Sequence, residues 1–121
     1  MFSFGKKSLE KRSQLHSDLQ KVVDEAIKHI DFSIICGHRG EEEQNEAFKS
    51  GASKLVYPNS KHNMEPSDAF DATPYPCDWS DIPSFQRLAD IIKQAAETTG
   101  VKIIWGGDWK TFKDYPHFEL A

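Results

Sequence analysis

The sequence contains few cysteines, no long apolar run and no excess of basic residues. Its two cysteines, Cys36 and Cys77, form no CxxC pair, so neither a redox motif nor a thiolate zinc finger is indicated. We expect Cys36 to be a small core residue and Cys77 to lie in a loop. The formal net charge of -4 provides no general positive surface for nucleic acid.

Segments that would direct the chain into or across a membrane are also lacking. No stretch approaches the roughly 18 consecutive apolar residues of a membrane-spanning helix. The start, Met-Phe-Ser-Phe-Gly-Lys-Lys, has no apolar core of signal-peptide length. We therefore expect a cytoplasmic product that binds no nucleic acid and does not insert into a membrane.

The composition is that of an ordinary globular domain. With 121 residues, of which 38% are hydrophobic and 28% charged, the chain suits one domain over residues 1–121 with a modest core. Apolar periodicity and turn residues predict helices over residues 8–30, 41–50 and 82–99, and strands over residues 32–36, 68–73, 101–105 and 117–120. Helices that precede or interrupt short strands predict an α+β fold, with a small antiparallel sheet and flanking helices.

Histidine and aspartate side chains in the second half of the chain have the chemistry of zinc ligands. A catalytic zinc takes three protein ligands, often imidazole and carboxylate, and keeps a fourth position open. We hypothesise that His62, Asp71 and His117 form such a set. The spacing alone is a weak signal, because no HExxH motif is present and loop histidines often serve as hydrogen-bonding groups. Asp68, six positions after His62, is a rival for the carboxylate ligand.

Other polar residues lie close to these candidates along the chain. Asp114 precedes His117 by three positions on a turn, a spacing that can place its carboxylate as a general base for water. Glu119 points to the same side of a strand as His117, so it is either a partner that orients this histidine or a rival base. Arg39 follows a strand end, where its cation can hold a substrate carboxylate or stabilise an oxyanion. Gln44, five positions later, can face the same cleft.

Five short motifs occur in a fixed order along the chain. They are Gly37-His38-Arg39, Ser60-Lys61-His62, Asp68-Ala69-Phe70-Asp71, Gly106-Gly107-Asp108-Trp109 and Asp114-Tyr115-Pro116-His117-Phe118-Glu119. Together they resemble the bacteriophage endolysins of the L-alanyl-D-glutamate peptidase type, which belong to the zinc D-Ala-D-Ala carboxypeptidase and VanY-like family. The resemblance runs from about residue 32 to the C-terminus, and five ordered motifs are far more specific than any one of them.

The resemblance implies a hedgehog/DD-peptidase fold and a role for individual residues. It implies that His62, Asp71 and His117 bind a Zn2+ cofactor and that Asp114 is the catalytic acid/base. Arg39 matches the family's arginine on the substrate side, where it would bind a stem-peptide carboxylate.

One departure from the family pattern concerns the first two ligands. In the family these two are usually closer together, whereas nine positions separate His62 from Asp71 here. The extra length lies in residues 63–67. We prefer Asp71 to Asp68, because the Asp-Ala-Phe-Asp run followed by Ala-Thr-Pro-Tyr matches the family's strand and its exit. Strand alternation also lets only one of the two acids face the metal.

The activity implied by the resemblance is zinc-dependent hydrolysis of bacterial peptidoglycan stem peptides, at the L-Ala–D-Glu bond. Gln44 and Ser60 match polar positions that line the substrate cleft. Two alternatives remain: a D-Ala-D-Ala carboxypeptidase that uses the same site, and a non-catalytic wall-binding module on the same fold. Retention of Asp114 beside the three ligand candidates argues against the second alternative.

The same resemblance implies a role in lysis of the host by a phage. The enzyme would wait in the host cytoplasm until a holin permeabilises the membrane, and would then act on the cell wall. We expect a monomer with a single catalytic domain and no separate wall-binding domain. Wall attachment would then come from the catalytic domain itself, with a basic N-terminal cluster as the candidate surface: Lys6, Lys7, Lys11 and Arg12.

Overall fold

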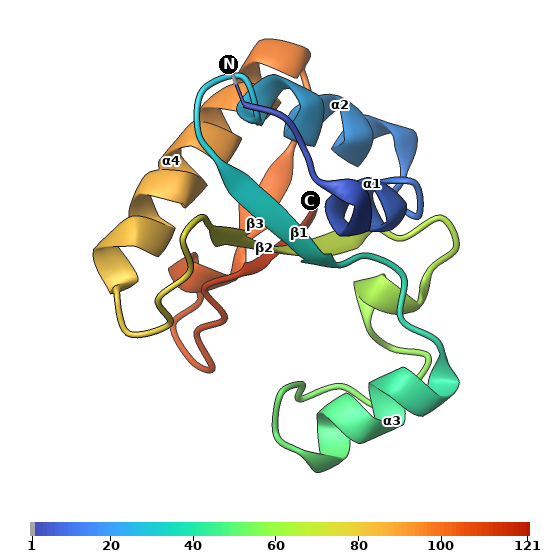
Figure 1. The fold of residues 1–121 in the computed structure, drawn as a ribbon. Helices are drawn as coiled ribbons and strands as arrows, with labels where there is room; N and C mark the ends of the chain where they lie inside the picture. Colours follow the sequence, from blue (N-terminus) through green and yellow to red (C-terminus); the bar gives the residue numbers. More distant parts are fainter. Residues whose placement is uncertain (1) are drawn as a thin grey trace.

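The computed structural model describes residues 2–121, which form one antiparallel sheet with helices around it (Figure 1). The helices are α1 (Lys6–Arg12), α2 (Ser17–Ala26), α3 (Glu41–Lys49) and α4 (Ile82–Thr99), with 3-10 turns η1 (Lys61–Asn63) and η2 (Gly106–Asp108). The strands are β1 (Phe32–Cys36), β2 (Ala69–Pro74), β3 (Ile103–Trp105) and β4 (His117–Leu120). The expected α+β class with a small antiparallel sheet is confirmed.

The strand order in the sheet is β1-β2-β4-β3, so the last strand of the chain, β4, is an inner strand. All three neighbouring pairs are antiparallel, and β2 pairs with both β1 and β4. The register sets Asp71 opposite His117 on β4 and opposite Cys36 on β1. Residues that are far apart in sequence are thereby brought to one point of the sheet.

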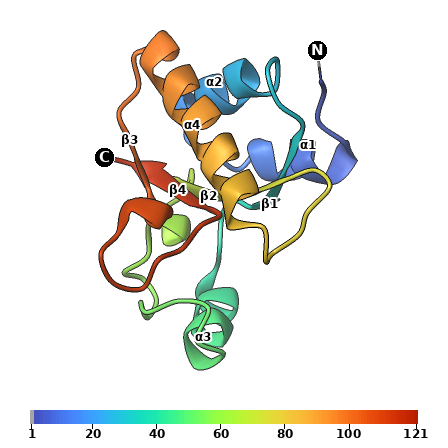
Figure 2. The same ribbon diagram turned by 90° about the vertical axis from the view of Figure 1, so that its left-hand side faces the viewer.

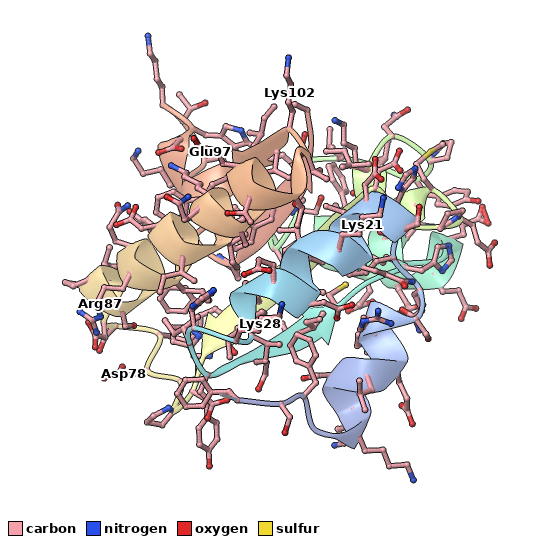
Figure 3. The ribbon with its side chains drawn as sticks, turned by 90° about the horizontal axis from the view of Figure 1, so that it is seen from above. Lys21, Lys28, Asp78, Arg87, Glu97 and Lys102 are labelled. Atoms are coloured by element: carbon pink, nitrogen blue, oxygen red, sulfur yellow. The ribbon has the colours of Figure 1, made fainter. Side chains whose placement is uncertain are left out.

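Helices α2 and α4 pack side by side over one face of the sheet, as the view from above shows (Figure 3). Their charged residues, including Lys21 on α2 and Arg87 and Glu97 on α4, project outward. Their apolar stripes pack inward against the strands in one continuous core. Helix α4 begins where the Asp81 side chain accepts the Ser84 N–H (3.2 Å). None of the helices described within residues 2–121 combines the length and the apolar character needed to cross a membrane.

The prediction of one helix over residues 8–30 is wrong, because the chain breaks between α1 and α2. The His16 backbone N–H donates to the Ser67 carbonyl (2.9 Å), and the Ser67 N–H donates to the Gln14 carbonyl (2.9 Å). The His16 ring then caps α2 by accepting the Asp18 N–H (3.0 Å). Backbone groups that a continuous helix would have used are bound instead to a distant loop. Strand β3 is also shorter than expected, since it begins at Ile103.

Helix α3 projects away from the body of the protein with the loop that follows it (Figures 1 and 2). We refer to residues 40–59 as the arm. Within this range only the side chain of Gln44 is buried. The arm therefore has no hydrophobic core of its own, and it faces the body of the protein across a cleft.

Candidate active site

The site is built on the face of the sheet that points away from α2 and α4. On β2 and β4 side chains alternate, so Phe70 and Phe118 enter the core while Asp71 and His117 face the other side. The two phenylalanine rings stack with centroids 5.2 Å apart and are fully buried. This packing fixes the two strands relative to each other and therefore fixes the separation of Asp71 and His117.

His62 comes from turn η1 and is held by hydrogen bonds on both sides. The Ser60 hydroxyl accepts the His62 backbone N–H (3.2 Å) and so caps the turn. The ring atom Nδ1 lies 2.7 Å from the Gly37 carbonyl oxygen. A carbonyl can only accept, so Nδ1 carries the hydrogen and the free lone pair lies on Nε2. Only 2% of the His62 surface is exposed.

Three ligand atoms converge at this point. His62 Nε2 lies 3.2 Å from Asp71 Oδ1 and 3.2 Å from His117 Nδ1, and the latter two atoms are 3.3 Å apart. In a tetrahedral zinc site with bonds of about 2.0–2.1 Å, neighbouring ligand atoms are about 3.3–3.4 Å apart. The three atoms therefore have the mutual spacing of one face of such a tetrahedron, and the set fits a zinc ion.

A second carboxylate orients His117 from behind. Glu119 Oε1 accepts a hydrogen bond from His117 Nε2 (2.7 Å), which leaves the lone pair of His117 on Nδ1, toward Asp71. Lys61 holds Glu119 in turn, since its Nζ lies 3.3 Å from Glu119 Oε2 and also contacts the Leu120 carbonyl. Histidine ligands of metals are commonly oriented by such carboxylates.

The electrostatics of the centre attract a cation. Burial lowers the pKa of both imidazoles, but the Asp71 carboxylate outweighs burial and raises the pKa of His62 to about 10 and that of His117 above its usual range. Burial raises the pKa of Asp71, yet hydrogen bonds from the two imidazoles hold it well below its usual range. A buried carboxylate between two imidazoles therefore stabilises positive charge, whether protons or a metal ion supply it.

Cys36 lies beside this centre, which the sequence reasoning missed. Ligand atoms of Cys36, His62 and Asp71 lie within 4.8 Å of one another, so they form an alternative metal-binding group. Cys36 Sγ faces His62 Nδ1 (3.8 Å), the nitrogen that already donates to Gly37. We favour the set that contains His117, because it uses the free nitrogen of His62. The expectation that Cys36 is a core residue is wrong, and only the pairing of β1 with β2 reveals its position.

The centre opens into a cleft of about 590 Å³. Arg39, Ser60 and Asp114 line this cleft together with the three ligand candidates. Arg39 Nη2 lies 3.6 Å from Asp71 Oδ2, on the oxygen that does not face the histidines. Burial raises the pKa of the Asp114 carboxyl, and the neighbouring Asp71 carboxylate adds to this effect, although nearby cations oppose it. Aromatic side chains from Trp79, Trp109 and Phe112 form further parts of the wall.

Gln44, expected on the cleft surface, is instead fully buried behind Arg39. Its Oε1 accepts a hydrogen bond from Arg39 Nη1 (3.0 Å), so its influence on the cleft passes through that guanidinium. The sequence offered no signal for this burial. Arg39 and Gln44 are five positions apart across a loop and the start of a helix, and this separation is compatible with many relative positions of the two side chains.

The additional length in residues 63–67 leaves the centre undisturbed. Met64 is half exposed, while the Ser67 hydroxyl is buried and donates to the Ala69 carbonyl (2.6 Å). Asp68 precedes β2, where its N–H donates to the Lys61 carbonyl (3.1 Å) and its carbonyl accepts the Leu120 N–H (2.9 Å). The Asp71 carboxylate is the acid that lies between the two histidines, at 3.2 Å from His62 Nε2 and 3.3 Å from His117 Nδ1.

Comparisons with known proteins identify the family and match the fold. The sequence model of the family described as phage L-alanyl-D-glutamate peptidase matches residues 1–120. The peptidoglycan L-alanyl-D-glutamate endopeptidase CwlK of Bacillus subtilis (strain 168) is 33% identical over 128 residues, which cover 89% of this chain and 74% of that protein. The crystal structure of the L-Ala D-Glu endopeptidase ChiX of Serratia marcescens superposes with a TM-score of 0.85 at 30% identity, covering 98% of this chain and 90% of ChiX. The chain therefore belongs to the phage L-alanyl-D-glutamate peptidase family.

Proposed function

We propose that the protein is a zinc-dependent endopeptidase that hydrolyses the L-Ala–D-Glu bond of peptidoglycan stem peptides. The convergence of one carboxylate and two imidazole nitrogens at 3.2–3.3 Å, beside Asp114 in an open cleft, carries this proposal. The activities named for CwlK and ChiX support the bond and the substrate class.

The proposed zinc ligands are His62 Nε2, Asp71 Oδ1 and His117 Nδ1. A mixed set of nitrogen and oxygen donors at this spacing suits zinc. Zinc, when bound, supplies Lewis-acid polarisation of a carbonyl oxygen and makes water acidic enough to lose a proton near neutral pH. Gly37 and Glu119 keep the two imidazoles in the tautomers that such binding requires.

Asp114 is the proposed acid/base. Its carboxylate would accept a proton from the attacking water and later deliver that proton to the amine that leaves the cleaved bond. A raised pKa makes the carboxylate a stronger base for the first step, and it helps the carboxyl retain the proton until the leaving amine accepts it. Arg39, whose charge is permanent, would hold a carboxylate of the stem peptide, with Ser60 on the same wall.

We further propose a role in host lysis by a phage, in which the enzyme acts on the wall after a holin has opened the membrane. The matching family is described as a phage peptidase, which supports the link to a phage. Attachment to the wall would use the N-terminal lysines Lys6, Lys7 and Lys11, since Arg12 is already paired with Asp24 (2.6 Å). A single catalytic domain and a monomeric state stay predictions.

The substitution Asp114→Ala tests the proposed activity. We expect zinc content and thermal stability close to wild type, and hydrolysis of purified cell walls slower by about 10²- to 10⁴-fold. Asp90→Ala, which removes an exposed carboxylate of α4, is the matched control and should leave hydrolysis unchanged. Full activity of the Asp114 variant would show that the assigned mechanism is wrong.

Mass spectrometry of the digested wall identifies the bond. New N-terminal D-Glu indicates the endopeptidase, whereas loss of terminal D-Ala indicates a D-Ala-D-Ala carboxypeptidase on the same site. If no wall substrate is turned over in a metal-dependent way, the protein is instead a non-catalytic wall-binding module.

A further inference from the structure

The buried amide of Gln44 uses its whole hydrogen-bonding capacity. Its oxygen Oε1 accepts from Arg39 Nη1 (3.0 Å) and from Asn63 Nδ2 (3.2 Å). Its nitrogen Nε2 donates to the Ser53 hydroxyl (2.9 Å) and to the Leu55 carbonyl (2.6 Å). An amide can accept two hydrogen bonds and donate two, so none of its capacity is left for a ligand.

The partners also fix which way the amide points. The Arg39 guanidinium can only donate, and the Leu55 carbonyl can only accept. Turning the amide over would therefore set donor against donor and acceptor against acceptor. Glutamate has nearly the same shape but no N–H group, so it can satisfy Arg39 but not Leu55. The site is specific for glutamine.

Every hydrogen bond described between the arm and the rest of residues 2–121 passes through this side chain. The backbone hydrogen bonds of residues 40–59 stay within the arm. The bonds that leave it run from Gln44 to Arg39 and to Asn63, the neighbour of His62 on turn η1. One further contact crosses the cleft, where Lys54 Nζ lies 5.2 Å from the centre of the Phe112 ring.

The two ends of the amide serve two parts of the cleft. Its oxygen end holds the Arg39 guanidinium, which lies beside Asp71 and lines the cleft. Its nitrogen end holds residues 53–55 against α3, and these residues form most of the wall that the arm contributes. A shift at Gln44 therefore moves both the cation and the wall.

We infer that Gln44 is a positioning residue, which sets Arg39 and the arm wall relative to the catalytic centre without touching substrate. This inference rests on the proposed function for its catalytic consequence. Its structural part, the attachment of the arm through one amide, is independent of the reaction.

Hydrogen exchange tests the attachment without any reaction. An isolated helix of nine residues is marginal in water, so amide protection in α3 reports its docking. Gln44→Leu removes all four hydrogen bonds, and exchange should rise by about tenfold or more over residues 41–59 while β1 and β2 stay protected. Gln44→Glu keeps the bond to Arg39 and should raise exchange chiefly at residues 53–55. Asn45→Ala, at the exposed neighbouring position of α3, is the control and should change neither.

A double-mutant cycle tests the link to Arg39. Gln44→Leu should lower kcat/KM on stem peptides by about tenfold or more when Arg39 is present, with zinc content unchanged. In an Arg39→Ala background the loss should be several-fold smaller, because only the displaced arm wall then contributes. In NMR spectra of the wild type, the hydrogen-bonded guanidinium protons of Arg39 should exchange slowly with water and give sharp signals. These signals should be lost in Gln44→Leu.

Equal losses in both backgrounds, or an arm whose exchange is unchanged in Gln44→Leu, would overturn the inference. An inactive wild-type protein would instead contradict the proposed function. In that case the exchange and NMR measurements still decide whether Gln44 holds the arm and Arg39.

Discussion

The two faces of strands β2 and β4 carry opposite chemistry. On one face Phe70 and Phe118 are fully buried and stack in the core. On the other face Asp71 and His117, their neighbours in the chain, converge with His62 around a candidate metal centre. Strand alternation alone separates the two functions, because successive side chains point to opposite sides of a sheet.

This difference shows how a small protein keeps a charged site rigid. The buried carboxylate depends on the two imidazoles as hydrogen-bonding partners, and the imidazoles repel each other when both are protonated, so the three groups need a rigid support. The stacked phenylalanines supply it from the reverse face, one residue away on each strand. The arm side of the cleft has no such apolar support, and its position depends on the hydrogen bonds of Gln44.

Substitution of two consecutive residues is the strongest test of the two faces. His117→Ala should abolish stoichiometric zinc binding and wall hydrolysis, because one of three ligands is lost. Phe118→Ala should instead lower the free energy of unfolding by about 3–5 kcal/mol, because it leaves a cavity beside Phe70. Metal analysis and denaturant unfolding of both metal-free variants separate the effects. If His117→Ala still binds one equivalent of zinc, the ligand assignment is wrong.

Local patterns predicted the faces well because they depend on neighbouring residues. The alternation around Asp71 and the helical stripe of α4 are visible in the sequence, and the family motifs identified the residues that converge at the centre. The matching family and the superposition on ChiX confirm the α+β fold and the family. The roles of the individual site residues stay predictions.

Long-range contacts account for what the sequence did not reveal. The break between α1 and α2 depends on Ser67, which is distant in the chain. The position of Cys36 depends on the register of β1 with β2. The burial of Gln44 depends on partners from both sides of the cleft. None of these partners is close enough in sequence to leave a periodic signal.

Glu119→Gln tests the cleft face of β4, because it weakens the hydrogen bond that orients His117 and leaves all three proposed ligands in place. Glutamine can still accept the hydrogen bond from His117, but it lacks the charge that strengthens it, so zinc affinity should fall by about 10- to 100-fold. Competition with a chromophoric chelator measures the affinity. Lys61→Met is the matched control: it removes the cation that holds Glu119 but leaves the carboxylate, so its effect should be smaller. A larger effect of the lysine substitution would contradict this order.

The pH dependence of kcat/KM tests the environment of Asp114. A general base must be ionised, and burial and Asp71 raise the pKa of this carboxyl, so it is protonated at a higher pH than an exposed aspartate. Activity should therefore fall about tenfold per pH unit below a midpoint that lies above the ordinary value of about 3.9. Zinc content is measured at each pH, because protonation of the histidines also releases metal. If the loss of activity follows zinc release at every pH, the fall of kcat/KM at low pH does not report the protonation of Asp114.

The smallest expected effect concerns the contact that bridges the mouth of the cleft. Lys54→Met removes the cation that lies over the Phe112 ring, and exposed contacts of this kind are weak, so KM should rise by about two- to fivefold while kcat stays unchanged. Lys110→Met removes an exposed lysine two positions before Phe112 and serves as the control for net charge. Phe112→Leu should match Lys54→Met, and the double variant should add little, because both single changes remove one contact. A large loss in kcat would mean instead that the arm reaches the reacting groups directly, and the division between a rigid sheet side and an arm that only frames the substrate would fail.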